Sequence, residues 1–140
     1  MSNDGLFSAR SLEVLKLGLD AFAMRGRVIA RSVAHAATPG YQAERVAFEE
    51  SLREALERGD GIPSAKPTPG HIPVGGHALD EVKPEVIDSP DPTLPGDPNN
   101  VVIEREMADL AQNQLLFQAA ARLAAAHYST LKAAIRGHNR

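Results

Sequence analysis

The chain has 140 residues, a formal net charge of −3, 4% aromatic residues, and neither Trp nor Cys. This length is typical of one domain, and the lack of Cys excludes a disulfide framework and a thiolate metal site. Basic residues are scattered among acidic ones and no run of 18 apolar residues occurs, which argues against a nucleic-acid-binding block and a transmembrane helix.

The first predicted element is an amphipathic helix over residues 8–37. Gly26 lies within it and lowers helix stability by roughly 1 kcal/mol relative to Ala. An indifferent glycine and a close approach by a neighbouring backbone remain alternatives there. Arg25, Arg27 and Arg31 are interpreted as a solvated face. The heptad track that we expect to pair this helix runs through Leu12, Leu15, Leu19, Phe22, Ile29 and Val33, and a parallel track runs through Val14, Leu17, Ala21, Met24 and Val28.

Residues 38–61 are predicted to form a turn and a short helix. The residue before a proline is pushed out of the helical region, so the first helix ends near Thr38. Pro39 and Gly40 fit the centre of a type II turn, because Gly supplies a positive φ, and Tyr41 follows. Residues 47–57 then show the periodicity of an amphipathic helix, with an apolar face formed by Phe48, Leu52, Ala55 and Leu56.

Residues 62–98 contain nine of the ten prolines, which excludes helix over most of this span. We expect an extended Pro/Gly-rich excursion, for which mobility is one alternative. Ile72–Val74 and Glu85–Ile87 are the two pieces that fit short strands or extended arms.

The last predicted element is a helix over residues 99–136, for which Asn99 and Asn100 offer a cap. At 1.5 Å per residue it is roughly 54 Å long, too long for the core of a compact domain of this size. Its main heptad track runs through Ile103, Met107, Leu110, Gln114, Phe117, Ala121, Ala124, Tyr128, Leu131 and Ile135. A second track runs through Asn113, Leu116, Ala120, Leu123, His127, Thr130 and Ala134.

These elements predict a single all-α domain, in which the two long terminal helices pair as a coiled-coil-like hairpin. Small residues thin the hairpin seam, so the lone chain is expected to be marginally stable. Because a two-track stripe is wider than one partner covers, we expect the main tracks to close the hairpin and the second tracks to meet other subunits.

No catalytic, cofactor-binding or metal-ligating constellation is found. No two of the five His are spaced i, i+4, and His71 and His77 are interpreted as solvated loop residues. The amino terminus lacks the basic region and apolar core of a cleavable secretory signal. The sequence therefore favours a structural or interaction role over an enzyme.

Two motifs resemble those of the bacterial flagellar basal-body rod proteins, and within that family the proximal-rod members. The first runs from Ala34 to Tyr41, where the family has Asn-x-Ala-Asn-x-x-Thr-Pro-Gly-Tyr; this chain keeps the Thr-Pro-Gly-Tyr but has Ser32 and His35 in place of the Asn residues. The second is Asn-Asn-Val at residues 99–101 followed by Glu-Arg-Glu-Met at 104–107, with Val102 replacing an Asp of the family pattern.

The resemblance implies a structural subunit that is exported unfolded by the flagellar type III apparatus and polymerises helically into the torque-transmitting rod. It implies contacts with further copies, other rod proteins, a FliE-type adaptor and the export gate, and no nucleic acid, small-molecule ligand, cofactor or membrane insertion. The alternative is a cytoplasmic helical-hairpin adaptor or export chaperone.

Overall fold

A computed structural model describes residues 9–57, 79, 82–89 and 99–137. In chain order, the elements are α1 (Ala9–Ala34), β1 (Glu44–Ala47), α2 (Glu49–Glu57), β2 (Glu85–Asp88) and α3 (Ile103–Arg136). The two long helices begin and end within a few residues of the ranges predicted from the sequence. The predicted strand at Ile72–Val74, and His71 and His77, lie outside the described residues.

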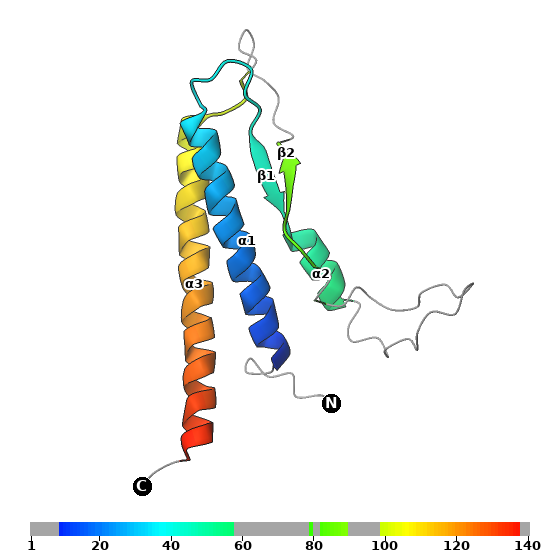
Figure 1. The fold of residues 1–140 in the computed structure, drawn as a ribbon, viewed down its shortest axis with the longest axis vertical. Helices are drawn as coiled ribbons and strands as arrows, with labels where there is room; N and C mark the ends of the chain where they lie inside the picture. The colour runs from blue at the N-terminus through cyan, green and yellow to red at the C-terminus, as the bar shows by residue number, and fades with distance from the viewer. Residues whose placement is uncertain (1–8, 58–78, 80–81, 90–98, 138–140) are drawn as a thin grey trace, which may run out of the picture.

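The described elements form three layers with α1 in the middle (Figure 1). On one side of it lies α3, which runs in the opposite direction, and on the other side lie the two strands and α2. Because α3 has 34 residues and α1 has 26, α3 continues beyond the amino-terminal end of α1. No helix in the described ranges is both long enough and apolar enough to span a membrane.

The prediction of an all-α fold is correct for most of the structure but omits a two-stranded antiparallel sheet. In this sheet Glu44 pairs with Asp88 and Ala47 with Glu85. The Ser89 N–H donates to the Ala43 carbonyl oxygen at 2.9 Å and extends the ladder by one bond. The strand at Glu85–Ile87 is one of the sequence alternatives, whereas β1 was not predicted and falls partly in the range assigned to the short helix.

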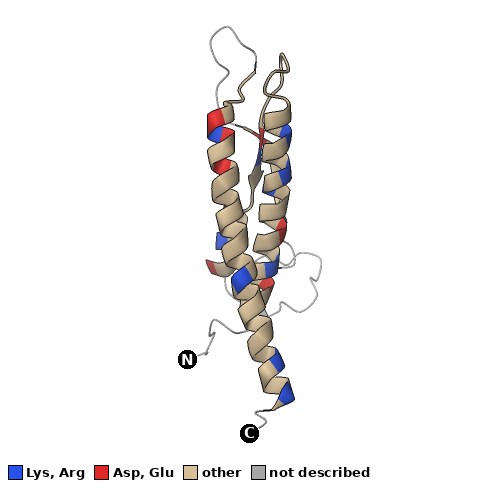
Figure 2. Ribbon diagram, turned by 90° about the vertical axis from the view of Figure 1, so that its left-hand side faces the viewer, with Lys and Arg blue, Asp and Glu red and all other residues tan. Residues whose placement is uncertain are grey.

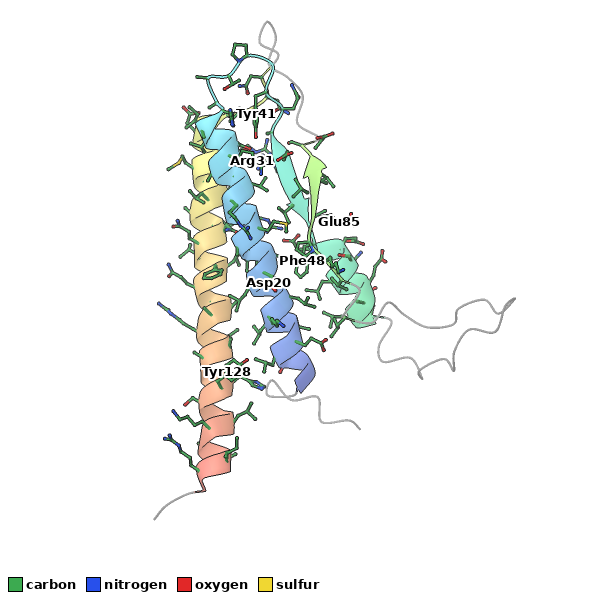
Figure 3. All side chains as sticks on the ribbon, viewed as in Figure 1. Asp20, Arg31, Tyr41, Phe48, Glu85 and Tyr128 are labelled. Atoms are coloured by element: carbon green, nitrogen blue, oxygen red, sulfur yellow. The ribbon has the colours of Figure 1, made fainter. Side chains whose placement is uncertain are left out.

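The second apolar track of α1 packs within the chain. Val14 and Leu17 contact a buried cluster formed by Ala21, Phe48, Ala55, Leu79 and Val82, with Leu52 packed alongside. Phe48 lies where the strand pair meets α2 (Figure 3). The expectation that other subunits complete this track is therefore wrong for α1, because α2 and its flanking residues already cover it.

The α3 surface that faces α1 also differs from the prediction. Its buried residues are Glu106, Asn113, Ala120 and His127, which recur at heptad spacing. Most of the track expected to close the helix pair is exposed, including Met107, Gln114 and Tyr128. The seam is thus rotated toward the second track, which contains Asn113, Ala120 and His127, and it also includes Glu106, which neither predicted track contains.

Candidate assembly interface

The turn after α1 has the predicted type II geometry. Gly40 has φ +76°, and the Tyr41 N–H donates to the Thr38 carbonyl oxygen at 3.3 Å. A positive φ at the third residue and this bond across the turn are what a type II turn requires. The turn directs the chain out of α1 and into β1, so it sets where the outer layer begins.

His35, which stands where the family pattern has Asn, takes part in this turn through its ring. The ring stacks on that of Tyr41, with centroids 4.8 Å apart and planes 17° from parallel. Its Nδ1 lies 3.3 Å from Thr38 Oγ1, within hydrogen-bonding distance. The replacement therefore exchanges an amide for an aromatic contact with Tyr41 on the exposed surface of the turn.

Asn99 and Asn100 join the turn to the start of α3, and they do not cap α3 as predicted. The residue at the α3 N-cap is Val102, which makes no side-chain cap. Instead, Asn99 Nδ2 donates to the carbonyl oxygens of His35, Ala36 and Thr38, at 3.1, 3.0 and 2.9 Å. These carbonyl groups belong to the turn that follows Ala34, the last residue of α1, so Asn99 fixes the turn to the segment before α3.

Asn100 makes the complementary contact with the outer layer. Its Oδ1 accepts a 2.6 Å hydrogen bond from the Ala43 N–H, immediately before β1. Both asparagine side chains are buried, at 3% and 6% residue exposure. The pair therefore ties α1, β1 and α3 together at one end of the molecule, and only the fold reveals this role.

Three arginines link the layers through ion pairs. Arg45 on β1 reaches across to α3, with its guanidinium 3.1 Å from Glu106 and 3.0 Å from Asp109. The Glu106 side chain is 2% exposed, so it depends on this partner. Arg25 and Arg31 of α1 pair with Glu49 and Glu44. The Arg25 side chain is 21% exposed, which corrects its assignment to a solvated face, whereas Arg31 is 58% exposed.

The outward surface of α3 is exposed, apolar and almost uncharged. Between Leu110 and Leu131 the only Asp, Glu, Lys or Arg is Arg122, and Figure 2 shows α3 without charge over most of its length. Of the predicted assembly residues, Met107, Leu116, Phe117, Leu123, Tyr128, Leu131 and Ile135 are exposed, and Ile29 is buried. The predicted residues Leu12, Leu15, Leu19, Phe22, Val33 and Leu110 are half-buried.

Sequence reasoning missed Leu115, which is 68% exposed and lies beside Leu116 on α3. An uncharged helical face with several large exposed side chains is typical of a surface that binds another protein. Within the described residues, no group of three or more His, Asp or Glu is placed to hold a metal ion.

No family model matches the chain. It is 34% identical to the flagellar basal body rod protein FlgB of Salmonella typhimurium over 107 residues, which cover 71% of this chain and 74% of that protein. The corresponding protein of Escherichia coli is 31% identical with the same coverage. That of Bacillus subtilis is 27% identical over 94% of this chain and 97% of its own length.

The chain belongs to the FlgB family of flagellar basal body rod proteins. This membership confirms the resemblance drawn from the motifs at residues 34–41 and 99–107. As an FlgB-family member the chain is a structural protein of the basal-body rod and not an enzyme. In the structure the two family motifs meet, since Asn99 binds the carbonyl groups that precede the Pro-Gly turn.

Proposed function

We propose that this chain, as a structural subunit of the proximal rod, is exported by the flagellar type III apparatus and polymerises helically into the periplasm-spanning drive shaft. The observation that carries the proposal is the match to FlgB proteins over both terminal helices, up to 94% of the chain.

The surface of the molecule supports a role in a polymer. A helix exposed along one side is normally charged there, whereas the outward side of α3 carries large apolar side chains. We assign this side to contacts with neighbouring subunits, including further copies and other rod proteins. The antiparallel α1–α3 pair would act as a coiled-coil-like unit within a single rod-type domain.

The turn residues Thr38, Pro39, Gly40 and Tyr41 would set the angle between this helix pair and the outer layer. A fixed angle matters in a helical polymer, because each subunit repeats the same contacts along the assembly. On the family resemblance, a FliE-type adaptor and the export gate are the partners at the base of the rod.

Fractionation tests the proposal. A tagged chain expressed in a flagellated strain that lacks its own copy is expected to restore rods and to remain in sheared, detergent-washed basal bodies. When export is disabled, the chain should stay in the cell and no rod should form. Recovery only in the soluble lysate would contradict the proposal and favour an adaptor or chaperone.

A further inference from the structure

We propose that the carboxyl-terminal end of α3, Tyr128–Arg136, docks on α2 of a second copy of this chain. The contact deepens the proposed function, on which its place in a rod rests, by naming one interface between subunits. It follows from two surfaces at opposite sides of the molecule that match in shape, polarity and charge.

The first surface is the part of α3 that extends past α1. Leu131 and Ile135 are 43% and 85% exposed and lie four residues apart, on the same side of the helix. Lys132 and Arg136 form a second row beside them at the same spacing. Figure 1 shows that this end of α3 has no described partner helix, and Figure 3 places Tyr128 close to the point where α1 begins.

The charge of this end is entirely positive. From Leu110 to Arg136, α3 contains Arg122, Lys132 and Arg136 and no acidic residue. Figure 2 shows the acidic residues of α3 near its start and only basic residues toward its end. Any protein surface that covers Leu131 and Ile135 therefore gains from an acidic rim.

The second surface is a shallow hollow of about 380 Å³ on one flank of α2. Leu52 and Leu56 lie four residues apart and form its apolar part, and Leu56 is 40% exposed. Glu49, Arg53 and Glu57 form a row beside them at the same spacing. The whole of α2 contains four glutamates and one arginine, and Arg53 already pairs with Glu50 and lies 3.9 Å from Glu57.

The two surfaces are complementary row by row. Each presents an i, i+4 apolar pair flanked by a charged row, acidic in excess on α2 and basic on α3. Placing Leu131 and Ile135 over Leu52 and Leu56 brings the basic row toward the glutamate side chains. Electrostatic attraction between such patches favours this pairing over the repulsive pairing of two α3 ends.

The contact must join different molecules. Within one chain the end of α3 extends beyond the start of α1 and points away from α2, so it does not meet its own α2 (Figure 1). A contact between two different surfaces of identical subunits is heterologous, and it repeats to give a ring or an open helix. Both outcomes suit a subunit of a tubular rod.

Cysteine cross-linking tests the contact, because the chain has no Cys of its own. Purified full-length Leu56→Cys and Ile135→Cys chains are mixed with a short bismaleimide, and each is also treated alone. We expect a cross-linked dimer in the mixture and in neither single sample. A dimer from Ile135→Cys alone would indicate an isologous α3–α3 contact and overturn the proposal.

Matched positions on the same helices provide the controls. Ala133→Cys lies on the opposite side of α3 from Ile135, and Glu50→Cys lies outside the α2 hollow. We expect no cross-linked dimer when Ala133→Cys replaces Ile135→Cys in the mixture, or when Glu50→Cys replaces Leu56→Cys. Lys132→Glu added to the Ile135→Cys chain should cause loss of the product, and Glu57→Lys in the Leu56→Cys chain should restore part of it.

The doubly substituted chain, treated in purified basal bodies, separates this proposal from the rod function. A series of cross-linked products whose masses are multiples of the chain mass would support both the α2 contact and the rod function. A product in solution with the chain absent from basal bodies would overturn the rod function alone. A chain present in basal bodies that cross-links neither there nor in solution, or only to a protein of another size, would overturn the α2 contact alone.

Discussion

At the residue scale, the two adjacent asparagines make different long-range hydrogen bonds, and Asn99 Oδ1 also accepts a local one from the Val101 N–H at 2.7 Å. Asn99 uses its amide hydrogens, because Nδ2 faces three carbonyl oxygens that can only accept. Asn100 uses its amide oxygen, because Oδ1 faces the Ala43 N–H. The geometry thus fixes the orientation of both side-chain amides. Substitutions at the two positions are therefore expected to differ in their cost in stability.

Substitution by aspartate is expected to distinguish these two roles. Asn99→Asp removes the donor and places a negative charge at the carboxyl-terminal end of α1, so it should destabilise the chain by about 1.5–3 kcal/mol. Asn100→Asp keeps an acceptor for Ala43 and should cost less. Urea unfolding of the purified variants measures both losses. Equal losses would contradict the assignment of donor and acceptor.

Gly40 is constrained by its backbone alone. Its φ is +76°, and no atom lies within 4 Å of the position that a Cβ would occupy. Gly40→Ala should therefore cost about 1–2 kcal/mol through backbone strain. Gly40→Val should cost more, because β-branched residues are strongly disfavoured at positive φ, and Gly40→Asn should cost least. Thermal unfolding ranks the three variants; a Val variant as stable as the Ala variant would refute this account.

At the element scale, Gly26 shows why α1 and α3 pack as they do. A Cβ at Gly26 would lie 3.3 Å from Asn113 Nδ2, which donates to the Phe22 carbonyl oxygen at 2.9 Å. The glycine therefore makes room for a polar side chain in the seam between the helices. Neither sequence alternative is correct as stated, because the glycine is not indifferent and the group that approaches it is a side-chain amide and not a backbone.

A double-mutant cycle should reveal this coupling. In the native background Gly26→Ala crowds Asn113, which offsets the gain in helix propensity. In an Asn113→Ala background the same change should stabilise the chain by about 1 kcal/mol. Gly18→Ala is the control, because the nearest atom to its Cβ is 3.9 Å away on Phe22, and it should stabilise in both backgrounds. Additive free energies of unfolding at Gly26 and Asn113 would contradict the crowding.

The strand β1 depends on a partner far along the chain. It has four residues and no long apolar alternation, so its sequence does not stand out from a loop. Pairing with β2 supplies its backbone partners, and Arg45 anchors it to α3 through Glu106. Such a strand forms because of tertiary contacts, and the local β-propensity of its residues does not predict these contacts.

At the scale of the whole molecule, the exposed side of α3 should separate folding from assembly. Leu123 is 50% exposed, so Leu123→Glu should leave the helicity of the isolated chain unchanged. In a rod the same change would bury an unpaired charge at every repeat of the contact, which is costly. We expect a chain that is made and exported but builds no rod, as seen by circular dichroism and electron microscopy of basal bodies.

Two further variants control for this effect. Gln118→Glu adds the same charge at an exposed polar position of α3 and should assemble. Leu110→Glu adds it at the half-buried seam with α1 and should destabilise the isolated chain. If Leu123→Glu builds normal rods, that side of α3 is not an interface.

The sequence by itself determined the long helices, the type II turn and the family, because heptad spacing, Pro-Gly chemistry and contiguous motifs are local properties of the chain. Only the tertiary structure decided which side of each helix packs against another element and which side is exposed. The seam runs through Glu106 and Asn113 because Arg45 and the Phe22 carbonyl lie opposite them, and no apolar pattern reports such partners. Likewise Asn99 binds the turn after α1 because the fold brings it to a segment more than sixty residues earlier in the chain.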